Sequence, residues 1–289
     1  MPLSRSGCVE LLLRRRMSVA NRLREAVRSQ TAHANRNDQT GFHVLPKNDD
    51  TGFAPRRETT RVPPSSAVDV ANVDAWLIDL DNTLYPATVD LFPQFDARVG
   101  QYISRLLGVG PDEAARLQIK IWNEYGNSLR GLMSMYDCAP LDFIEFIHDI
   151  DLTSIDASPL LDQALRRLPG RKLIFTNGSA AHAERVMARM GVAHHFEAIF
   201  DIVASGFATK PETVVYRDIV KRFGLQPART MMVDDVAANL EPAHRLGMRT
   251  VWVRSRAVDS PLPTSGNRQD FVHHETDDLL GFLQQALDL

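Results

Sequence analysis

The chain has little cysteine, few aromatic residues and no long hydrophobic run. Its two cysteines, Cys8 and Cys138, fall in segments of different composition, which argues against a disulfide framework and favours a reducing cytoplasm. No apolar stretch approaches the roughly 18 residues that a membrane-spanning helix needs. The short run Leu11–Leu13 precedes its arginine cluster, whereas a secretory signal has its charges first. We therefore expect a soluble cytoplasmic protein without a membrane partner.

Aromatic residues make up 7% of the chain and are sparse in residues 1–70. That segment is rich in Arg, Asn, Asp, Thr and Pro, and such a composition cannot bury much surface. We expect a disordered or weakly helical extension, with one amphipathic helix near residues 9–29. An arm for nucleic acid or a membrane surface and a transit peptide are alternatives to a dispensable extension, whose true start would be Met17.

Charge is divided unevenly along the chain, although the net charge is only −3. Residues 1–70 carry 12 Lys and Arg against 7 Asp and Glu, whereas residues 71–289 carry 21 against 29. An acidic body suits a bound divalent cation better than a nucleic acid polymer. The 44% hydrophobic content is sufficient for a substantial core.

Apolar runs bounded by turns alternate with helical patterns from residue 73 onward. This alternation predicts an α/β fold with a doubly wound parallel sheet of the Rossmann type. Gly191, Gly224 and Gly247 lie where helices of this pattern would end. The expected strands are Ala75–Ile78, Lys172–Phe175, Ala198–Val203, Thr230–Val233 and Thr250–Val253, and the expected helices between and after them are Ala180–Met190, Glu212–Phe223, Ala237–Leu246 and Asp277–Leu287.

Nearly a hundred residues separate the first two expected strands, far more than the dozen that a crossover needs. Most of them have helical patterns, so we predict a helical cap domain at residues 88–155, inserted after the first strand. The α/β core would then comprise residues 71–87 and 156–289. An insert at this point would lie over the carboxyl edge of the sheet, where a lid belongs. Its expected helices are Leu91–Leu107, Pro111–Tyr125, Ser128–Tyr136 and Leu141–Ile150.

Polar side chains follow four of the expected strands or lie just beyond them. Each group also has a local explanation, because such residues form turns and helix caps and Lys210 could be a solvated surface lysine. Parallel strands, however, end at one edge of a sheet, and ligands of open α/β sheets bind there. We therefore expect the four groups to form one site. They are Asp79 with Asp81, Thr176 with Asn177, Lys210, and Asp234 with Asp235.

These residue types are suited to phosphate and metal chemistry. Mg²⁺ prefers a few carboxylates together with water and substrate phosphate, which Asp79, Asp234 and Asp235 could provide. Thr176 and nearby backbone N–H groups could hold phosphate oxygens at a helix N-terminus, and Lys210 adds positive charge. Asp79 could attack phosphorus to form an aspartyl-phosphate. Asp81 could protonate the leaving alkoxide and then activate water.

The motifs resemble, in order and context, those of the haloacid-dehalogenase-like hydrolase superfamily. The resemblance rests on Asp79–Leu84, Thr176-Asn177, Lys210-Pro211 and Asp234-Asp235, and it extends from residue 73 to about residue 255. It implies an Mg²⁺ cofactor, with the backbone carbonyl of Asp81 as a further ligand. It also implies a helical cap placed after the first motif.

Two longer stretches resemble the pyrimidine 5′-nucleotidase branch of that superfamily: Asp79–Pro86 and, in the insert, Tyr125–Met133. The resemblance implies a nucleoside monophosphate as the substrate. Arg130 could meet a phosphate or a base edge, and Tyr125 and Met133 could pack against a nucleobase. Alternatively, Tyr125, Met133 and Tyr136 form the core of the insert.

Other readings remain open at this level. A phosphatase for phosphoglycolate or a sugar phosphate needs the same core, a phosphoryl mutase is possible, and a dehalogenase does not need Asp81 as a leaving-group acid. A binding or regulatory module with a vestigial site is a further alternative.

His194-His195 and His273-His274 lack another ligand at a suitable spacing, so we expect no metal there. Asn239 either orients the metal carboxylates or is exposed. The oligomeric state is left open.

Overall fold

A computed structural model describes residues 70–254 and 270–288. The expected N-terminal extension, with its helix near 9–29, Cys8 and Met17, lies outside the described residues. Six strands form one sheet, and every neighbouring pair is parallel. They are β1 (Ala75–Ile78), β2 (Arg171–Phe175), β3 (Ala198–Phe200), β4 (Thr230–Asp234), β5 (Arg249–Val253) and β6 (His274–Thr276), in the spatial order β3-β2-β1-β4-β5-β6.

The predicted doubly wound parallel sheet is confirmed, with two differences at its edges. The third strand ends at Phe200 instead of Val203, because the carboxylate of Asp201 accepts the amides of Ala180 and Ala204 and the chain turns there. The sixth strand, His274–Thr276, was not expected, since three polar residues carry no strand pattern. It pairs with β5 at the edge of the sheet.

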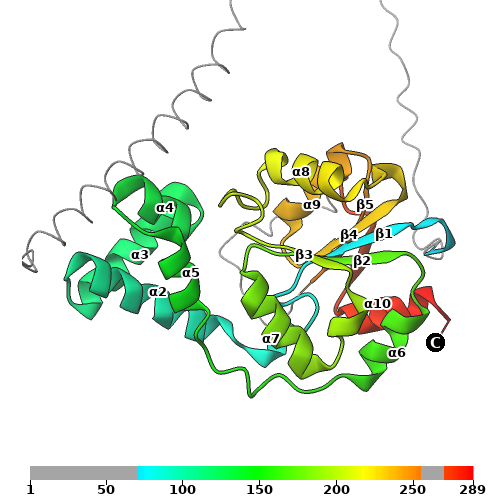
Figure 1. Ribbon diagram of the computed structural model, residues 1–289, viewed down its shortest axis with the longest axis horizontal. Coiled ribbons are helices and arrows are strands. Elements are labelled where there is room, and N and C mark those ends of the chain that lie inside the picture. Colours follow the sequence, from blue (N-terminus) through cyan, green and yellow to red (C-terminus); the bar gives the residue numbers. More distant parts are fainter. Residues whose placement is uncertain (1–69, 255–269, 289) are drawn as a thin grey trace, which may run out of the picture. The chain divides into compact units, whose positions relative to one another are not determined.

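Helices cover both faces of the sheet (Figure 1). Trp76 and Ile78 of β1 pack with α6, α7 and α10 in one hydrophobic cluster. Ala75 and Leu77, which point to the other face, pack with α8 and α9. The helices are α6 (Pro159–Arg167), α7 (Ala180–Met190), α8 (Thr213–Phe223), α9 (Ala237–Arg245) and α10 (Leu279–Ala286), and the single 3₁₀ turns are η1 (Val70–Asn72), η2 (Ala87–Val89), η3 (Ala193–His195) and η4 (Pro227–Arg229).

Four further helices follow β1 in the chain and precede α6 (Figure 1). They share a separate hydrophobic cluster. This cluster also includes Ile202 and Phe207, which follow β3 in the core. We call residues 88–155 the insert, with the bounds predicted above; these bounds stay a prediction. Its helices are α2 (Phe92–Leu107), α3 (Pro111–Tyr125), α4 (Ser128–Met135) and α5 (Pro140–Ile147), each within three residues of its predicted ends.

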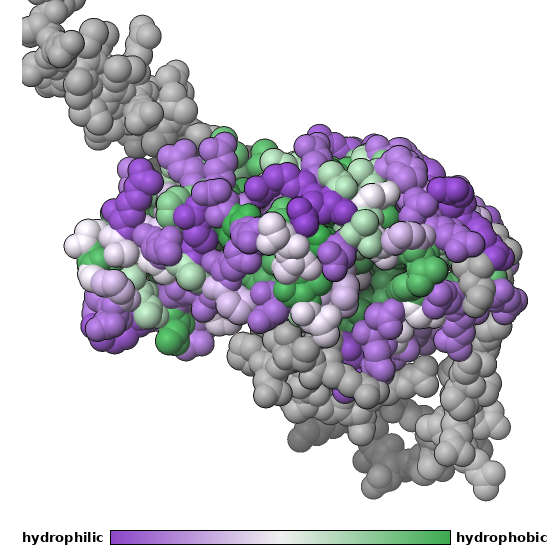
Figure 2. Space-filling view, turned by 90° about the horizontal axis from the view of Figure 1, so that it is seen from below, coloured by the Kyte–Doolittle hydropathy of each residue, from purple (hydrophilic) through white to green (hydrophobic). Residues whose placement is uncertain are grey.

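Hydrophilic residues cover most of the face in Figure 2, with hydrophobic residues in small groups between them. Single exposed hydrophobic side chains such as Ile119, Leu160 and Val214 are normal on protein surfaces. Among the residues that the structure describes, no helix has the length and apolar character to span a membrane.

Candidate active site

The turn after β1 carries the first pair of carboxylates to the carboxyl edge of the sheet. The amide of Asp79 still donates to the carbonyl of Val233 at 3.0 Å, so the chain is paired with β4 up to this residue. Asn82 then adopts a left-handed conformation with φ 60°, which Asn tolerates better than most residues. The amide of Leu84 closes the turn on the carbonyl of Leu80 at 2.9 Å.

Lys210 lies at the centre of the site and joins three strand ends. Its Nζ donates to Oδ1 of Asp79 at 2.7 Å, to Oδ2 of Asp234 at 2.7 Å and to the carbonyl of Phe175 at 2.8 Å. Burial disfavours the ammonium, but the carboxylates of Asp234 and Asp79 outweigh this and raise the pKa of Lys210 above its usual value. Lys210 is therefore a fixed, buried positive charge.

Three carboxylates of the site approach one another closely enough to hold a metal ion. Oxygen atoms of Asp79, Asp234 and Asp235 lie within 4.8 Å of one another. Burial raises the pKa of Asp79 to about 7 against the opposing effect of Lys210, and burial also raises the pKa of Asp235 well above its usual range. An oxygen-only ligand set with excess negative charge fits a hard divalent cation, which would favour the ionised carboxylates.

Asn239 orients one of these carboxylates, which confirms the first of its two expected roles. It is 6% exposed, and its Nδ2 donates to Oδ1 of Asp234 at 2.9 Å. The amide of Val236 donates to the same oxygen at 2.9 Å. Since Lys210 binds Oδ2, both oxygens of Asp234 have defined partners.

The carboxylate of Asp81 has a different set of partners. The hydroxyl of Tyr85 donates to its Oδ1 at 2.7 Å, and Nε2 of His182 lies 2.9 Å from the same oxygen. Burial acts against the charge of Asp81, but the hydrogen bonds of His182 and Tyr85 dominate and lower its pKa. Both neighbours bind Oδ1, whereas Oδ2 points toward Gly178, where a Cβ atom would lie 3.6 Å from it.

A second histidine, which comes from the insert, lies against His182. His148, at the end of α5, stacks on His182 with a ring-centroid distance of 4.7 Å, and Phe95 of α2 contacts both rings edge-on. Nδ1 of His148 donates to the carbonyl of Ile144 at 2.8 Å, and burial lowers its pKa to about 4. A Cβ at Gly178 would lie 3.4 Å from Nε2 of His148, so this nitrogen faces the loop after β2.

Tyr85, His148 and His182 were not identified as site residues from the sequence. His182 lies in the first turn of α7 and is fully buried. Its Nδ1 has no hydrogen-bond partner among the described residues. A histidine in a helical pattern is no signal by itself, and its link to Asp81 spans 101 residues. The contact of Tyr85 could have been predicted, because Tyr85 lies only four residues after Asp81 in the same turn.

The loop after β2 is arranged around Thr176 and Asn177. The hydroxyl oxygen of Thr176 accepts the amide of Gly178 at 2.8 Å, which leaves the hydroxyl proton for another acceptor. Oδ1 of Asn177 accepts the amide of Lys210 at 2.8 Å, and its Nδ2 donates to the carbonyl of Lys210 at 3.2 Å. Asn177 thus fixes the main chain that carries Lys210, and a contact between Asn177 and phosphate stays a prediction.

The three predicted specificity residues lie in or beside α4. Tyr125 is half-buried at the end of α3, where a Cβ on Gly131 would lie 3.1 Å from its ring. Arg130 is exposed and pairs at 3.6 Å with Glu212, two residues after Lys210. Met133 is 42% exposed. The structure therefore connects one insert residue, Arg130, to the loop that carries Lys210.

The sequence model of the haloacid dehalogenase-like hydrolase family, described as a hydrolase, matches residues 73–247. This range contains β1 to β4, the insert and every core motif residue described above. It covers more than half of the chain.

Curated and solved relatives agree with that match. The chain is 27% identical over 195 residues to Phosphate metabolism protein 8 of Saccharomyces cerevisiae, with 60% of this chain and 59% of that protein covered. It is 28% identical over 114 residues to Fructose-1-phosphate phosphatase YqaB of Escherichia coli, with 38% and 58% covered. The chain thus spans less than two thirds of the length of these relatives. A HAD phosphatase from Thermococcus onnurineus aligns with a TM-score of 0.53 at 20% identity, covering 74% of this chain and 98% of that one.

Proposed function

Because the chain belongs to the haloacid dehalogenase-like hydrolase family, we propose that it is an Mg²⁺-dependent phosphomonoesterase that hydrolyses nucleoside monophosphates. The observation that carries the hydrolytic part is the separation of two carboxylates in one turn. Asp79 lies against Lys210 and the metal carboxylates, whereas Asp81 is held apart by Tyr85 and His182. Two carboxylates in different environments can take the roles of nucleophile and acid–base.

In the first step, a carboxylate oxygen of Asp79 attacks phosphorus, and the bond between phosphorus and the ester oxygen breaks. Oδ2 of Asp81 gives its proton to the leaving alkoxide, because Oδ1 is already bound by two neighbours. A phosphate group beside Asp81 adds negative charge, which raises the pKa of Asp81 and favours the proton that it must deliver. The products are an alcohol and the aspartyl-phosphate of Asp79.

In the second step, Asp81 takes a proton from water, and the water oxygen attacks the phosphorus of the aspartyl-phosphate. The bond between Asp79 and phosphorus breaks, so inorganic phosphate leaves and the carboxylate of Asp79 is restored. Asp81 is the base in this step because it gave up its proton in the first one. His182 and Tyr85 hold it in place throughout.

The phosphate group would be held by the hydroxyl of Thr176 and the amides of Asn177 and Ser179, beside the positive charge of Lys210, whose three protons are directed at Asp79, Asp234 and Phe175. Other amides of this loop have internal partners: that of Gly178 donates to Thr176, and that of Ala180 donates to Asp201. The amides of Asn177 and Ser179 have no hydrogen-bond partner among the described residues, so both would be available to phosphate oxygens. The site therefore offers neutral hydrogen-bond donors and a fixed positive charge to the phosphate.

Asp79, Asp234 and Asp235, with the backbone carbonyl of Asp81, fit an Mg²⁺ ion by donor chemistry, since all are hard oxygen atoms. The bound ion would neutralise charge on the transferred phosphoryl group. Lys210 keeps Asp79 and Asp234 together, and Asn239 fixes the orientation of Asp234. These contacts preorganise the carboxylates before an ion arrives.

A nucleotide substrate is supported by the resemblance of Asp79–Pro86 and Tyr125–Met133 to pyrimidine 5′-nucleotidases. In the structure the second stretch includes Arg130, whose pairing with Glu212 brings α4 to the loop of Lys210. A nucleoside monophosphate bound by its phosphate at the core would extend its base toward this stretch. Met133, an apolar side chain of the same stretch that is 42% exposed, would be available to pack against the base.

A small-metabolite phosphatase is the second candidate. It is favoured by the relatives, since the Escherichia coli protein is named as a fructose-1-phosphate phosphatase and a 30% identical one from Thioalkalivibrio sulfidiphilus as an enolase-phosphatase. The core chemistry is the same in both candidates. Only the contacts made by the insert would differ.

Release of inorganic phosphate from a panel of phosphomonoesters tests the proposal. The panel contains pyrimidine and purine nucleoside monophosphates, phosphoglycolate and several sugar phosphates, each with Mg²⁺ and with a chelator. Asp79→Asn serves as the background control, because its amide cannot attack phosphorus.

We expect nucleoside monophosphates to give the highest kcat/KM, and Asp79→Asn and the chelator to abolish phosphate release. Equal or faster turnover of phosphoglycolate or a sugar phosphate would overturn the nucleotide assignment. Turnover by a well-folded Asp79→Asn variant would overturn the covalent mechanism.

A further inference from the structure

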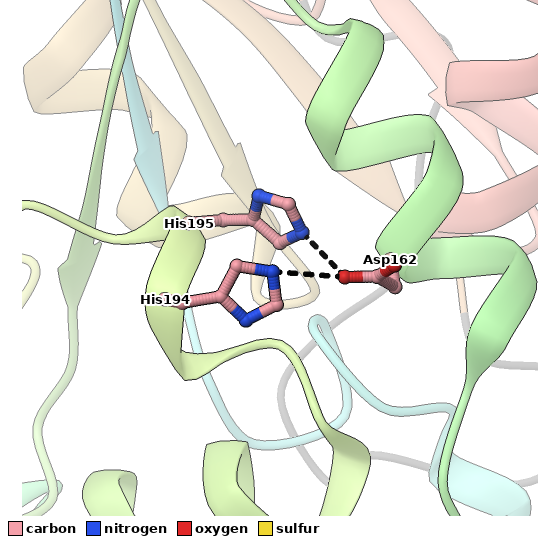
Figure 3. A group of neighbouring side chains, drawn as sticks. All are labelled: Asp162, His194 and His195. Atoms are coloured by element: carbon pink, nitrogen blue, oxygen red, sulfur yellow. Dashed lines mark hydrogen bonds and ion pairs between the residues drawn. The ribbon is translucent and has the colours of Figure 1, made fainter.

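Two adjacent histidines on the surface of the core meet a carboxylate from another helix. His194 and His195 form the end of η3, and Asp162 lies in the first turn of α6. Nε2 of His195 lies 2.8 Å from Oδ1 of Asp162, and Nε2 of His194 lies 3.1 Å from the same oxygen. Figure 3 shows both rings directed toward Asp162. This third ligand has no local sign in the sequence, because Asp162 is distant in the chain and reaches the histidines only through the packing of α6 against η3.

The geometry points to a second metal site, in which Asp162, His194 and His195 bind a zinc ion. All three ligand atoms lie within 4.8 Å of one another. A tetrahedral zinc ion with bonds of about 2.0–2.1 Å needs ligand atoms about 3.3 Å apart. The two observed contacts to Oδ1 would therefore open by only a few tenths of an ångström. His194 is 61% exposed, so its ring has room to make this adjustment.

The donor set selects the kind of ion. Two imidazoles and one carboxylate suit Zn²⁺ and related transition ions, whereas Mg²⁺ prefers sites made of oxygen alone. The two sites therefore favour different cations: Asp79, Asp234 and Asp235 offer only oxygen ligands, whereas this site offers two nitrogen ligands and one oxygen. Three protein ligands on a partly exposed surface also leave a fourth position for water.

Arg166 is the main competitor of an ion at this site. Its Nη2 pairs with Oδ2 of Asp162 at 2.8 Å, one turn along α6. The guanidinium therefore occupies one carboxylate oxygen and leaves the other to the imidazoles. Its positive charge opposes a cation, but its side chain is 69% exposed, so solvent screens this effect. Removing Arg166 should strengthen binding a few-fold.

The position of the site indicates a structural role. η3 directly precedes β3, so it lies near the amino edge of the sheet, opposite the edge that carries Asp79 and Asp81. An ion bound there would tie α6 to the connection between α7 and β3. Ligands that bind only the folded state raise its stability by mass action. Zinc should therefore raise the unfolding temperature without any contact with substrate.

A zinc titration of the full chain, without an affinity tag, tests this inference. Zinc bound per chain is measured by competition with a zinc-binding dye, in excess Mg²⁺ so that the catalytic carboxylates are occupied. The variants are His194→Asn, an exposed position that costs little stability, and Asp162→Asn. Arg166→Gln is the matched control, because it lies on the same helix and supplies no ligand. Thermal unfolding with and without zinc provides the second readout.

We expect the wild type to bind one zinc ion more than His194→Asn and Asp162→Asn, and to gain a few degrees in unfolding temperature that these variants lack. Arg166→Gln should keep the ion and bind it a few-fold more tightly. Equal zinc binding by the wild type and both ligand variants would overturn the site and leave a hydrogen-bonded cluster. Loss of zinc in Arg166→Gln would also contradict it. Ligands elsewhere, such as His33, His43 and Cys8, cancel in these differences.

Discussion

His182 Nε2 lies 2.9 Å from Asp81 Oδ1, although the two residues are 101 positions apart in the chain. His182 is fully buried, and its other ring nitrogen has no partner among the described residues. Because a carboxylate oxygen accepts, Nε2 of His182 donates to Asp81, and the single polar contact of the ring is spent on that carboxylate. His182 is thus a positioning residue for the acid–base group.

Replacing His182 should affect substrates according to their leaving groups. In His182→Ala, Asp81 loses a neighbour that directs its Oδ2 at the ester oxygen, so we expect kcat/KM for alkyl phosphates to fall about 10- to 100-fold. An aryl phosphate with an acidic alcohol needs little protonation and should lose much less. The value of kcat/KM depends only on the steps up to and including the first irreversible one. It therefore reports this proton transfer and not the later hydrolysis of the aspartyl-phosphate.

Phe95→Leu is the matched control for that variant. Phe95 contacts the rings of His182 and His148 but makes no polar contact with Asp81. It should lower stability without changing the leaving-group dependence. Equal losses of kcat/KM for alkyl and aryl phosphates in His182→Ala would show that His182 only supports the fold.

Lys210→Met should destabilise the metal-free protein strongly. Asp79 and Asp234 would then face each other in the interior without the ammonium that joins them. Removing one partner of a buried ion pair costs about 3–5 kcal/mol. We expect a loss of this size in the free energy of unfolding, measured by urea denaturation in a chelator, and a partial recovery with Mg²⁺. Lys221→Met, at an exposed position of α8, should change stability little; a similar loss there would contradict the assignment.

Mg²⁺ binding should release protons and strengthen as the pH rises through about 7. The pKa of Asp79 is raised to about 7 by burial, and that of Asp235 is raised as well, whereas the ion needs both in their ionised form. Calorimetry in buffers of different ionisation enthalpy counts the released protons. Mg²⁺ affinity that does not change between pH 6 and pH 8 would contradict this coupling.

The same shift fixes the sign of a stability change in the metal-free protein. The folded-state pKa of Asp79 lies above its ordinary value of 3.8, so folding favours its protonated form. The resulting stabilisation is complete below about pH 4 and is lost as the pH rises through about 7. The contribution of Asp79 to the free energy of unfolding should therefore decrease over this range. In Asp79→Asn, which cannot titrate, this part of the pH dependence should be missing.

The core motifs could be predicted because each has a local signal at a strand end. Asp79, Thr176 and Asp234 directly follow runs of buried apolar residues, and Lys210 lies in a short loop beyond another. Parallel topology then brings these groups to one edge of the sheet, since strand direction alone decides where they end. Knowledge of the pattern of strands was therefore sufficient to assemble this part of the site.

Residues contributed by helix faces could not be predicted in the same way. His182 and His148 have no distinctive neighbours in the sequence, and they meet only because α5 of the insert packs near the start of α7. Asp162 likewise reaches His194 and His195 from a separate helix. Such contacts depend on side-chain packing between elements, and a single sequence contains no local record of it.

Gly131→Ala should destabilise the insert although alanine is the better helix former. Gly131 lies inside α4, where replacing glycine by alanine would ordinarily stabilise a helix by about 1 kcal/mol. Here the new Cβ would lie 2.3 Å from Cγ2 of Ile121 in α3, so the two helices would have to separate. Overpacking of this kind costs about 1–3 kcal/mol, which exceeds the gain. Urea denaturation should show a net loss larger than that of Gly110→Ala, whose Cβ would meet no atom within 4 Å and which changes only the N-cap of α3. A stabilised Gly131→Ala variant would mean that α3 and α4 are not closely packed in solution.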